Sequence, residues 1–377
     1  MQSEIYLDHA ATSPPYDQVV ERMHEVAKMG NPSSAHRRGR MAQEQLRQAR
    51  QQIADALEVE ASSVLFTSGA TEANNLAIYG TLAALNTRPK HLITSRIEHP
   101  SVLEPIRDLE RKGWSVTYLP CSSSGLIDPN QFAQAIRSDT VFASMMLVNN
   151  ETGIIQRIRS MAEVARAKKV VFHCDAVQGF GKIEVRPERL GVNLLTVSGH
   201  KIRGPRGVGM LLRSSTVQLE PMIRGGGQEF ALRPGTENCA GILGFALAIQ
   251  LALQDQEQNV KKLKERKKRL WHELRTRIPR ILRIGSADDQ NSVPQILCVG
   301  IPEHEAASMI RRLDHHGLAI ASGSACHSGS SAISPVLQAM DVDPNVARGM
   351  LRFSMTPDQP IEQLVEAAEI VKRVMLE

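Results

Sequence analysis

A lysine and an aspartate each come shortly after an apolar segment that predicts a buried strand. Residues 194–198, LLTVS, lead into Lys201. Partial burial lowers the pKa of a lysine amine, which makes Lys201 a candidate Schiff-base nucleophile. By itself, Lys201 is more simply interpreted as a turn residue. Asp175 follows residues 170–174, VVFHC. A buried carboxylate is costly without a partner, although a helix N-cap is an alternative interpretation of Asp175.

A small glycine-containing turn follows a third apolar segment. Residues 64–67, VLFT, lead into residues 68–75, SGATEANN. The start of a helix offers free N–H groups and the positive end of a dipole, and both favour an anion. The segment lacks G-x-x-x-x-G-K-[ST], so it is not a P-loop. An ordinary strand-to-helix turn with a Ser or Thr cap explains it equally well.

Together the three segments predict one ligand, because ligands bind at the carboxyl edge of strands in an open α/β sheet. Such a ligand carries a phosphate for the turn, a carbonyl for Lys201 and a basic ring nitrogen for Asp175. Pyridoxal phosphate has all three groups, and a Schiff-base lysine with an acidic partner for the pyridinium is its usual pair. The residues therefore predict a pyridoxal phosphate site in which Asp175 keeps the ring nitrogen protonated.

The elements that must position these residues alternate between short β-branched runs and longer helical stretches. This alternation predicts an α/β fold with a mainly parallel, doubly wound sheet over residues 15–255. Residues 1–14 and 256–377 are expected to form a smaller α+β domain with strands near 294–300 and 351–354. The strands predicted for the large sheet are residues 64–67, 91–95, 115–119, 141–148, 170–174, 194–198 and 208–212.

The composition bounds the class of protein. A chain of 377 residues predicts two or three domains. The net charge of +5 and aromatic content of 4% suit an anionic small ligand better than nucleic acid. Five cysteines occur without a C-x-x-C pair, so reduced thiols and no metal centre are expected. The N-terminal segment has no signal-peptide core, and the apolar run 239–253 is too short to span a bilayer, so we expect a cytoplasmic protein without a membrane segment.

Residues 255–278 predict a long, strongly basic helix. Its charged face is a candidate surface for nucleic acid, and a basic binding or scaffold protein is the rival class of function. The favoured interpretation is a solvated face with a narrow buried stripe formed by Leu263, Leu270 and Leu274. No direct contact with nucleic acid is therefore expected.

A segment of small polar residues lies in the second half of the chain. Residues 322–331 read SGSACHSGSS and have little to bury, so a mobile loop is expected. The loop carries Cys326 near its middle, where a thiol can reach more than one position.

The sequence resembles the cysteine desulfurases of the class-V pyridoxal-phosphate enzymes almost from end to end. The loop SGSAC is similar to that of the long-loop subgroup, which includes the nitrogen-fixation and housekeeping iron–sulfur enzymes. The segments that carry the resemblance are YLDHAAT at 6–12, NPSSAHRRG at 31–39, FTSGATEANN at 66–75, EH at 98–99, VNNETG at 148–153, FHCDAVQ at 172–178, SGHKIRG at 198–204, GGGQE at 225–229, RPGTEN at 233–238 and SGSAC at 322–326.

The resemblance implies a pyridoxal-phosphate fold of type I and a role for each matching residue. Lys201 would form the Schiff base, and His99 would stack on the ring and move protons. Thr236 would reach the cofactor phosphate of a neighbouring subunit, which implies a homodimer. The cofactor-binding residues implied by the resemblance are Ala70, Thr71, His99, Asn150, Asp175, Gln178, Ser198, His200, Lys201 and Thr236.

The resemblance also implies the reaction. Asn150 and Arg352 would hold the carboxylate of L-cysteine, and Cys326 would take its sulfur as a persulfide while L-alanine leaves. The persulfide would then serve a sulfur-acceptor protein, such as an iron–sulfur scaffold or a tRNA-thiolation protein. Alternatives on the same fold are a selenocysteine lyase or another class-V enzyme, including an aminotransferase, although transamination needs no thiol.

Three features depart from the family pattern. His327 directly follows Cys326 where a small residue is usual, and we expect a partly protonated His327 to favour the thiolate. Arg203 replaces an aromatic or aliphatic residue. Members that dock an iron–sulfur scaffold often have a longer tail than the stretch from Arg352 to Glu377, so the prediction of that partner stays open.

Overall fold

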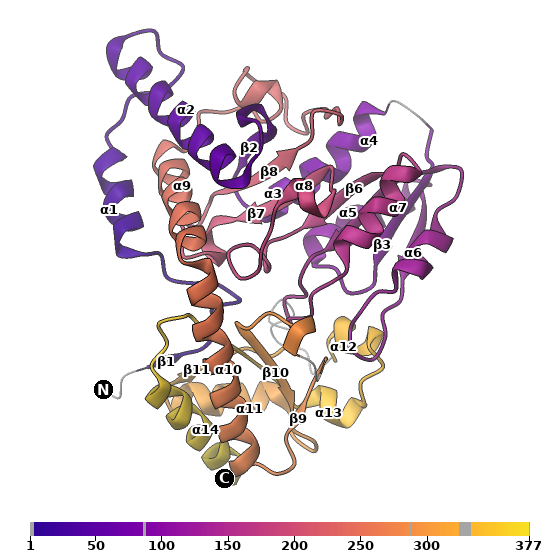
Figure 1. The fold of residues 1–377 in the computed structure, drawn as a ribbon, viewed down its shortest axis with the longest axis vertical. Coiled ribbons are helices and arrows are strands. Elements are labelled where there is room, and N and C mark those ends of the chain that lie inside the picture. Colours follow the sequence, from indigo (N-terminus) through magenta and orange to yellow (C-terminus); the bar gives the residue numbers. More distant parts are fainter. Residues whose placement is uncertain (1–3, 86–87, 287–288, 324–332, 377) are drawn as a thin grey trace.

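The computed structural model describes residues 4–85, 88–286, 289–323 and 333–376. Its upper part in Figure 1 contains a large sheet with helices on both faces, and its lower part contains two small sheets and both ends of the chain. The helix α10 (Gln256–Arg277) runs from the upper part into the lower part.

The large sheet has seven strands in the order β2-β8-β7-β6-β5-β3-β4. All neighbours from β7 to β4 are parallel, while β8 is antiparallel to both β2 and β7. The predicted fold class is therefore confirmed, and each predicted strand lies within two residues of the observed one. The strands are β2 (Val64–Thr67), β3 (His91–Ser95), β4 (Ser115–Leu119), β5 (Thr140–Met146), β6 (Val171–Asp175), β7 (Leu194–Ser198) and β8 (Gly209–Arg213).

Two apolar cores cover the two faces of this sheet, because successive side chains of a strand point to opposite faces. One core packs against α1 (Asp17–Val26), α2 (Arg37–Leu57), α6 (Pro129–Ala135), α7 (Ile158–Ala167) and α9 (Cys239–Gln254). The other packs against the helical segment formed by α3 (Ala70–Asn75), the π-helix η2 (Leu76–Gly80) and α4 (Thr81–Ala84), together with α5 (Pro100–Arg111). Shorter pieces are η1 (Ala61–Ser63), α8 (Pro187–Leu190), η3 (Gly199–Lys201) and η4 (Glu229–Ala231).

The lower part has its own apolar core. An antiparallel sheet of order β12-β10-β9 and a parallel pair β1-β11 pack against three helices there. The strands are β1 (Ile5–Tyr6), β9 (Leu282–Arg283), β10 (Ile296–Gly300), β11 (Leu318–Ala319) and β12 (Met350–Ser354), and the helices are α10, α11 (Ala306–His315) and α14 (Ile361–Leu376). The short elements η5 (Asp289–Asn291), α12 (Pro335–Ala339) and α13 (Pro344–Arg348) complete this part. The proposed boundary between two domains at residue 255 stays a prediction.

The helix α10 has the predicted buried stripe. Leu263, Leu270 and Leu274 are buried, while most of its lysines and arginines are not.

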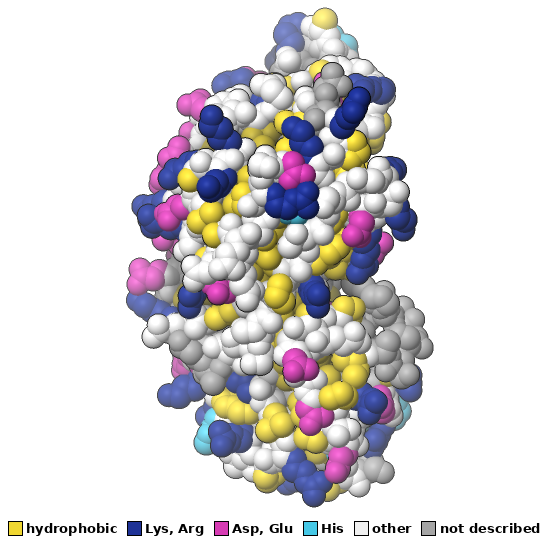
Figure 2. All heavy atoms as spheres, turned by 90° about the vertical axis from the view of Figure 1, so that its right-hand side faces the viewer, with side chains coloured by type: hydrophobic (Ala, Val, Ile, Leu, Met, Phe, Trp, Pro, Cys, Tyr) yellow, Lys and Arg dark blue, Asp and Glu magenta, His cyan; other side chains and the backbone are white. Residues whose placement is uncertain are grey.

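Figure 2 shows the face of the molecule that lies on the right of Figure 1. On this face, basic and acidic side chains are interspersed rather than gathered in a field of one sign.

Within the described ranges, no single helix is long and apolar enough to cross a membrane. The helices α9 and α10 reach the required length and apolarity only as a pair, across a 72° bend. Nine of the residues in α9 are buried inside the protein.

Candidate active site

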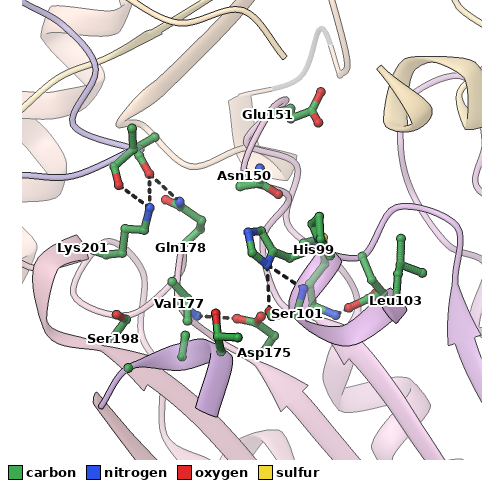
Figure 3. Close-up of a pocket in the computed structure, with 18 of the residues that line it drawn as sticks. His99, Ser101, Leu103, Asn150, Glu151, Asp175, Val177, Gln178, Ser198 and Lys201 are labelled. Atoms are coloured by element: carbon green, nitrogen blue, oxygen red, sulfur yellow. Dashed lines mark hydrogen bonds between the residues drawn. The ribbon is translucent and has the colours of Figure 1, made fainter. Parts of the chain in front are cut away.

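One cavity of about 960 Å³ opens at the carboxyl edge of the large sheet. The parallel strands all end on this side, so the segments that follow them converge on one space (Figure 3). Residues from the lower part close the cavity, and Gly323 and Arg352 line it. The predicted residues that line it are Ala70, Thr71, His99, Asn150, Asp175, Gln178, Ser198, His200, Lys201 and Arg352.

Lys201 lies on the 3₁₀ turn η3 directly after β7. Its Nζ donates to the backbone oxygens of Ala10 at 2.7 Å and Ala11 at 2.6 Å (Figure 3). Behind it, the buried Lys182 donates from Nζ to the backbone oxygen of Lys201 at 2.6 Å. Burial, reinforced by the charge of Lys201, lowers the pKa of Lys182 to about 7.

Asp175 ends β6 and is buried at the floor of the cavity. Its Oδ1 accepts from the backbone N–H of Val177 at 3.1 Å, and its Oδ2 accepts from Asn74 Nδ2 at 2.8 Å. Two neutral donors hold the carboxylate in place without neutralising its charge. Gln178 donates from Nε2 to the oxygen of Ala10 at 2.9 Å, and its buried Oε1 has no hydrogen-bond partner among the described residues.

The turn before α3 has the geometry of an anion site. Gly69 has φ of +152°, which favours glycine, and the helical segment from Ala70 runs through η2 and α4. His200 lies nearby, with Nδ1 3.2 Å from Thr12 Oγ1. Burial, reinforced by three neighbouring cations, lowers the pKa of His200 to about 4, so this ring is neutral. Arg206 also lines the cavity, and no motif in the sequence singled it out.

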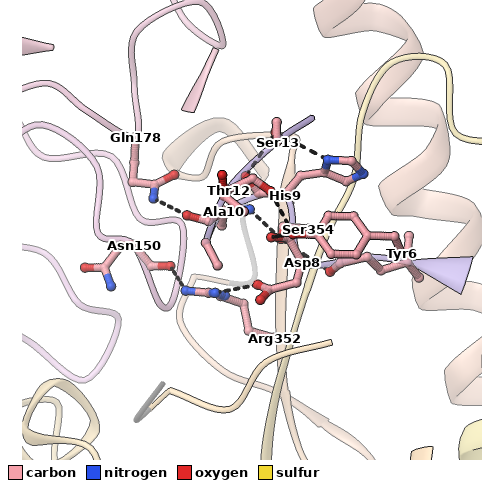
Figure 4. Close-up of polar contacts among 12 residues, drawn as sticks. Tyr6, Asp8, His9, Ala10, Thr12, Ser13, Asn150, Gln178, Arg352 and Ser354 are labelled. Atoms are coloured by element: carbon pink, nitrogen blue, oxygen red, sulfur yellow. Dashed lines mark hydrogen bonds and ion pairs between the residues drawn. The ribbon is translucent and has the colours of Figure 1, made fainter. Parts of the chain in front are cut away.

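Arg352 points into the cavity from β12 and is buried. Its Nη1 donates to the backbone oxygen of Asn150 at 2.9 Å, and its Nη2 donates to Asp8 Oδ1 at 2.7 Å (Figure 4). Sequence reasoning missed Asp8, although this residue stands inside the YLDHAAT motif. The bridge between Asp8 and Ser354 places it beside Arg352.

Two buried carboxyl groups were also missed. Glu98 accepts at Oε1 from Ser95 Oγ at 2.6 Å and from the N–H of Met146 at 3.0 Å. Burial raises the pKa of Glu98 to about 8. Glu151 accepts at Oε2 from Ser334 Oγ at 2.6 Å, and burial raises its pKa to about 7. A Glu next to a predicted site residue, as in EH and NNE, was the only signal in the sequence.

Two predicted site residues are absent from the described lining of this cavity, for different reasons. Thr236 is exposed and does not line it. Cys326, with its neighbour His327, lies outside the described residues. Gly323, directly before that segment, and Pro335, three residues after its end, both line the cavity.

Comparison with known proteins identifies the family. The model of the class-V aminotransferase family matches residues 5–366. The chain belongs to the class-V aminotransferase family. Enzymes of this family depend on pyridoxal phosphate.

The relatives that the chain matches over nearly its full length include cysteine desulfurases. The cysteine desulfurase IscS of Dictyoglomus turgidum is 39% identical over 377 residues, with 100% of this chain and 95% of that protein covered. The cysteine desulfurase IscS of Actinobacillus succinogenes is 39% identical over 379 residues, covering 99% of this chain and 93% of the other.

Solved class-V structures have the same fold. A NifS-like protein superposes with a TM-score of 0.92 at 31% identity, covering 99% of both chains. The protein SspA, solved in complex with cysteine, superposes with a TM-score of 0.82 at 33% identity, covering 93% of this chain and 99% of the other.

The cavity fits the cofactor of the class-V family. The buried Gln178 Oε1 has no described partner and can accept a hydrogen bond from a ring hydroxyl. The Asp175 carboxylate matches a pyridinium, and the turn at Gly69 matches a phosphate. Lys201 supplies an amine on the same cavity wall.

Arg203, a departure from the class-V pattern, has a structural partner. Its guanidinium lies 4.1 Å from the ring centroid of Tyr16, and its Nη1 donates to Asp358 at 3.0 Å. Tyr16, which lies on a different segment from Arg203, therefore supplies an aromatic ring on which Arg203 packs.

Four described cysteines are free thiols: Cys121, Cys174, Cys239 and Cys298. Burial raises the pKa of each of the four above its ordinary value. A raised pKa removes the thiolate, which is the reactive form, so none of the four has the environment of a nucleophile.

Proposed function

We propose that the protein is a cysteine desulfurase that converts L-cysteine to L-alanine and carries the released sulfur as a persulfide on Cys326. One observation carries the proposal: a lysine, a buried carboxylate and a buried arginine face one cavity whose wall adjoins the segment with Cys326. The full-length relatives are named for this activity. A transaminase would use the same lysine and carboxylate but no thiol.

Asp175, Gln178 and Lys201 would hold the ring of pyridoxal phosphate, and Ala70, Thr71, Ser198 and His200 would hold its phosphate. Arg206 would add positive charge near that phosphate. When bound, the cofactor withdraws electrons from the substrate and stabilises negative charge at its α-carbon.

Arg352 and Asn150 would bind the carboxylate of L-cysteine. Asp8 and the Asn150 carbonyl already hold the two Nη atoms of Arg352, so the guanidinium is oriented before the substrate arrives. The buried Nε of Arg352 has no hydrogen-bond partner among the described residues. The Asp8 pair therefore fixes the direction of Arg352 and leaves this donor for another contact.

Lys201 would take the proton from the substrate α-carbon at its Nζ, which must be neutral to do so. His99 would contact the bound molecule from the opposite wall of the cavity.

Cys326 would attack the sulfur of the substrate as a thiolate. An S–S bond forms and the Cβ–S bond breaks, and the electron pair of that bond stays with the carbon fragment. This fragment takes up a proton and leaves as L-alanine, while the enzyme keeps the persulfide. A sulfur-acceptor protein would then receive the outer sulfur, and a homodimer would bring Thr236 to the neighbouring site.

The test is to incubate the purified protein with L-cysteine and to measure L-alanine and protein-bound persulfide. We expect Cys326→Ser to lose persulfide and most of the alanine while it keeps the yellow colour of the bound cofactor. Cys121→Ser is the matched control and should behave as the wild type. Equal alanine release by wild type and Cys326→Ser would contradict the role of Cys326. A parallel assay with L-selenocysteine separates a desulfurase from a selenocysteine lyase.

A further inference from the structure

A buried chain of hydrogen bonds joins Asp175 to His99 through two side chains that the proposed chemistry does not use. Asn74 Nδ2 donates to Asp175 Oδ2 at 2.8 Å and also lies 2.9 Å from Ser101 Oγ. Ser101 Oγ is 2.7 Å from His99 Nδ1. Asn74 is 0% exposed and Ser101 is 7% exposed, so water does not compete for these contacts.

The direction of donation is fixed at both ends of this series of hydrogen bonds. At one end, the backbone N–H of Ser101 donates to His99 Nδ1 at 3.1 Å (Figure 3). A backbone N–H only donates, so Nδ1 carries no proton. At the other end, a carboxylate only accepts, so the amide of Asn74 turns its nitrogen toward Asp175. This orientation is kept although it leaves the buried Asn74 Oδ1 without a partner in the described part of the chain.

The hydroxyl of Ser101 then has one consistent role. It accepts from Asn74 Nδ2, and its own proton points to His99 Nδ1. The neutral imidazole therefore carries its proton on Nε2, which lies on the side of the ring away from Ser101, in the cavity that His99 lines. Protonation of Nδ1 would set a new proton against the N–H of Ser101.

We propose that Asn74 and Ser101 are positioning residues that hold His99 neutral with its proton on Nε2, so that His99 presents a hydrogen-bond donor to the bound substrate. The inference rests on the proposed function in one respect, because it takes this cavity as the active site. It assigns the two side chains a role in setting the tautomer, and the Asp175 carboxylate orients them.

The charged groups around His99 act in opposite directions. Burial lowers the pKa of His99, the charge of Asp175 opposes this effect, and the charge of Lys201 reinforces it. Glu98 precedes His99, and its Oε1 contacts Ser95 and Met146. The other charged groups that line the same cavity are Glu72, Arg96, Glu104, Arg107, Glu151, Arg206 and Arg352.

The experiment is nitrogen NMR of the full-length holoenzyme labelled with ¹⁵N-histidine, with the His99 signal assigned by its absence in His99→Gln. We expect the wild-type shifts of the Nε2–H tautomer at neutral pH. Ser101→Ala removes one of two donors to Nδ1, which should raise the pKa of His99 by about one unit. Ser101→Thr keeps a hydroxyl and should restore the wild-type titration, and the His200 signal serves as an internal reference.

Two results would overturn the inference. One is a wild-type His99 that carries its proton on Nδ1 at neutral pH. The other is a Ser101→Ala protein whose His99 titrates as in the wild type. Neither result depends on turnover. A failure of this inference is therefore distinguishable from a failure of the proposed function, which absent desulfurase activity in the wild type would contradict.

Discussion

Buried acids distinguish the candidate active site at the scale of single residues. Glu98 and Glu151 line the same cavity as Asp175, and burial raises the pKa of both glutamates into the neutral range. A protonated Glu151 adds no negative charge beside Arg352. Asp8 is then the carboxylate that pairs with Arg352, and Glu151 adds no second negative charge there while it is protonated.

Glu151 also predicts a pH-dependent contribution to stability. Its pKa rises from 4.5 to about 7 on folding, so the folded protein holds this proton more tightly than the unfolded chain. The contribution is complete below pH 4.5 and is lost as the pH rises to about 7. Glu151→Gln mimics the protonated acid, and its free energy of unfolding relative to wild type should increase by about 3 kcal/mol from pH 4.5 to pH 8. Urea unfolding at several pH values measures this difference, and parallel curves for the two proteins would contradict it.

At the scale of elements, the antiparallel strand β8 supports the turn that is proposed to hold the phosphate. A Cβ at Gly209 would lie 2.8 Å from the oxygen of Val197 and 2.9 Å from the backbone of Gly69. Only glycine lets β8 approach both β7 and the Gly69 turn this closely. The shape of the anion site thus depends on a residue in a different strand.

We therefore expect Gly209→Ala to weaken the binding of pyridoxal phosphate by about tenfold or more, in addition to destabilising the fold by about 1–3 kcal/mol. Gly300→Ala is the matched control, because a Cβ there would also collide with backbone, 2.7 Å from the oxygen of Val346, but in β10 of the lower part. The control should lose stability and keep its cofactor affinity. Spectroscopic titration with the cofactor measures the affinity, and equal loss in both variants would contradict the prediction.

At the scale of the whole molecule, the exposed position of Thr236 is consistent with a role in a neighbouring subunit. The described cavity does not include this residue. Arg50 nearby forms an ion pair with the buried Glu229, and Glu229 also accepts from the N–H of Phe66 in β2. The segment before Thr236 is therefore anchored to the large sheet while Thr236 itself faces outward.

If Thr236 acts on the site of the neighbouring subunit, two inactive variants should complement each other. Lys201→Ala lacks the amine, and Thr236→Ala lacks the contact to the phosphate. When an equal mixture of the two variants is dissociated and reassociated, about half of the dimers should contain one subunit of each variant. Each mixed dimer has one intact site out of two, so about a quarter of wild-type activity should return. Assays at limiting cofactor measure this, with each variant alone as the control. No recovery in mixed dimers, detected by tagged subunits, would contradict a shared site.

The sequence by itself determined the elements and the side of the sheet on which the chemistry lies. β-branched runs depend on near neighbours, so the strands were predicted within two residues. Lys201 follows β7 and Asp175 ends β6, and the carboxyl ends of these parallel strands share one edge. The predicted family and its fold were confirmed. The role of Cys326 stays a prediction.

Only the tertiary structure decided which groups touch and which are charged. Arg352 pairs with Asp8 across 344 positions of the chain, and Asn74 meets Asp175 across 101. The raised pKa values of Glu98 and Glu151 come first from burial, which the packing of distant segments creates. Local patterns do not encode such contacts, because hydrogen bonds and desolvation depend on distance in space. The pairing and protonation in the candidate active site were therefore settled by the packing of both parts of the molecule around one cavity.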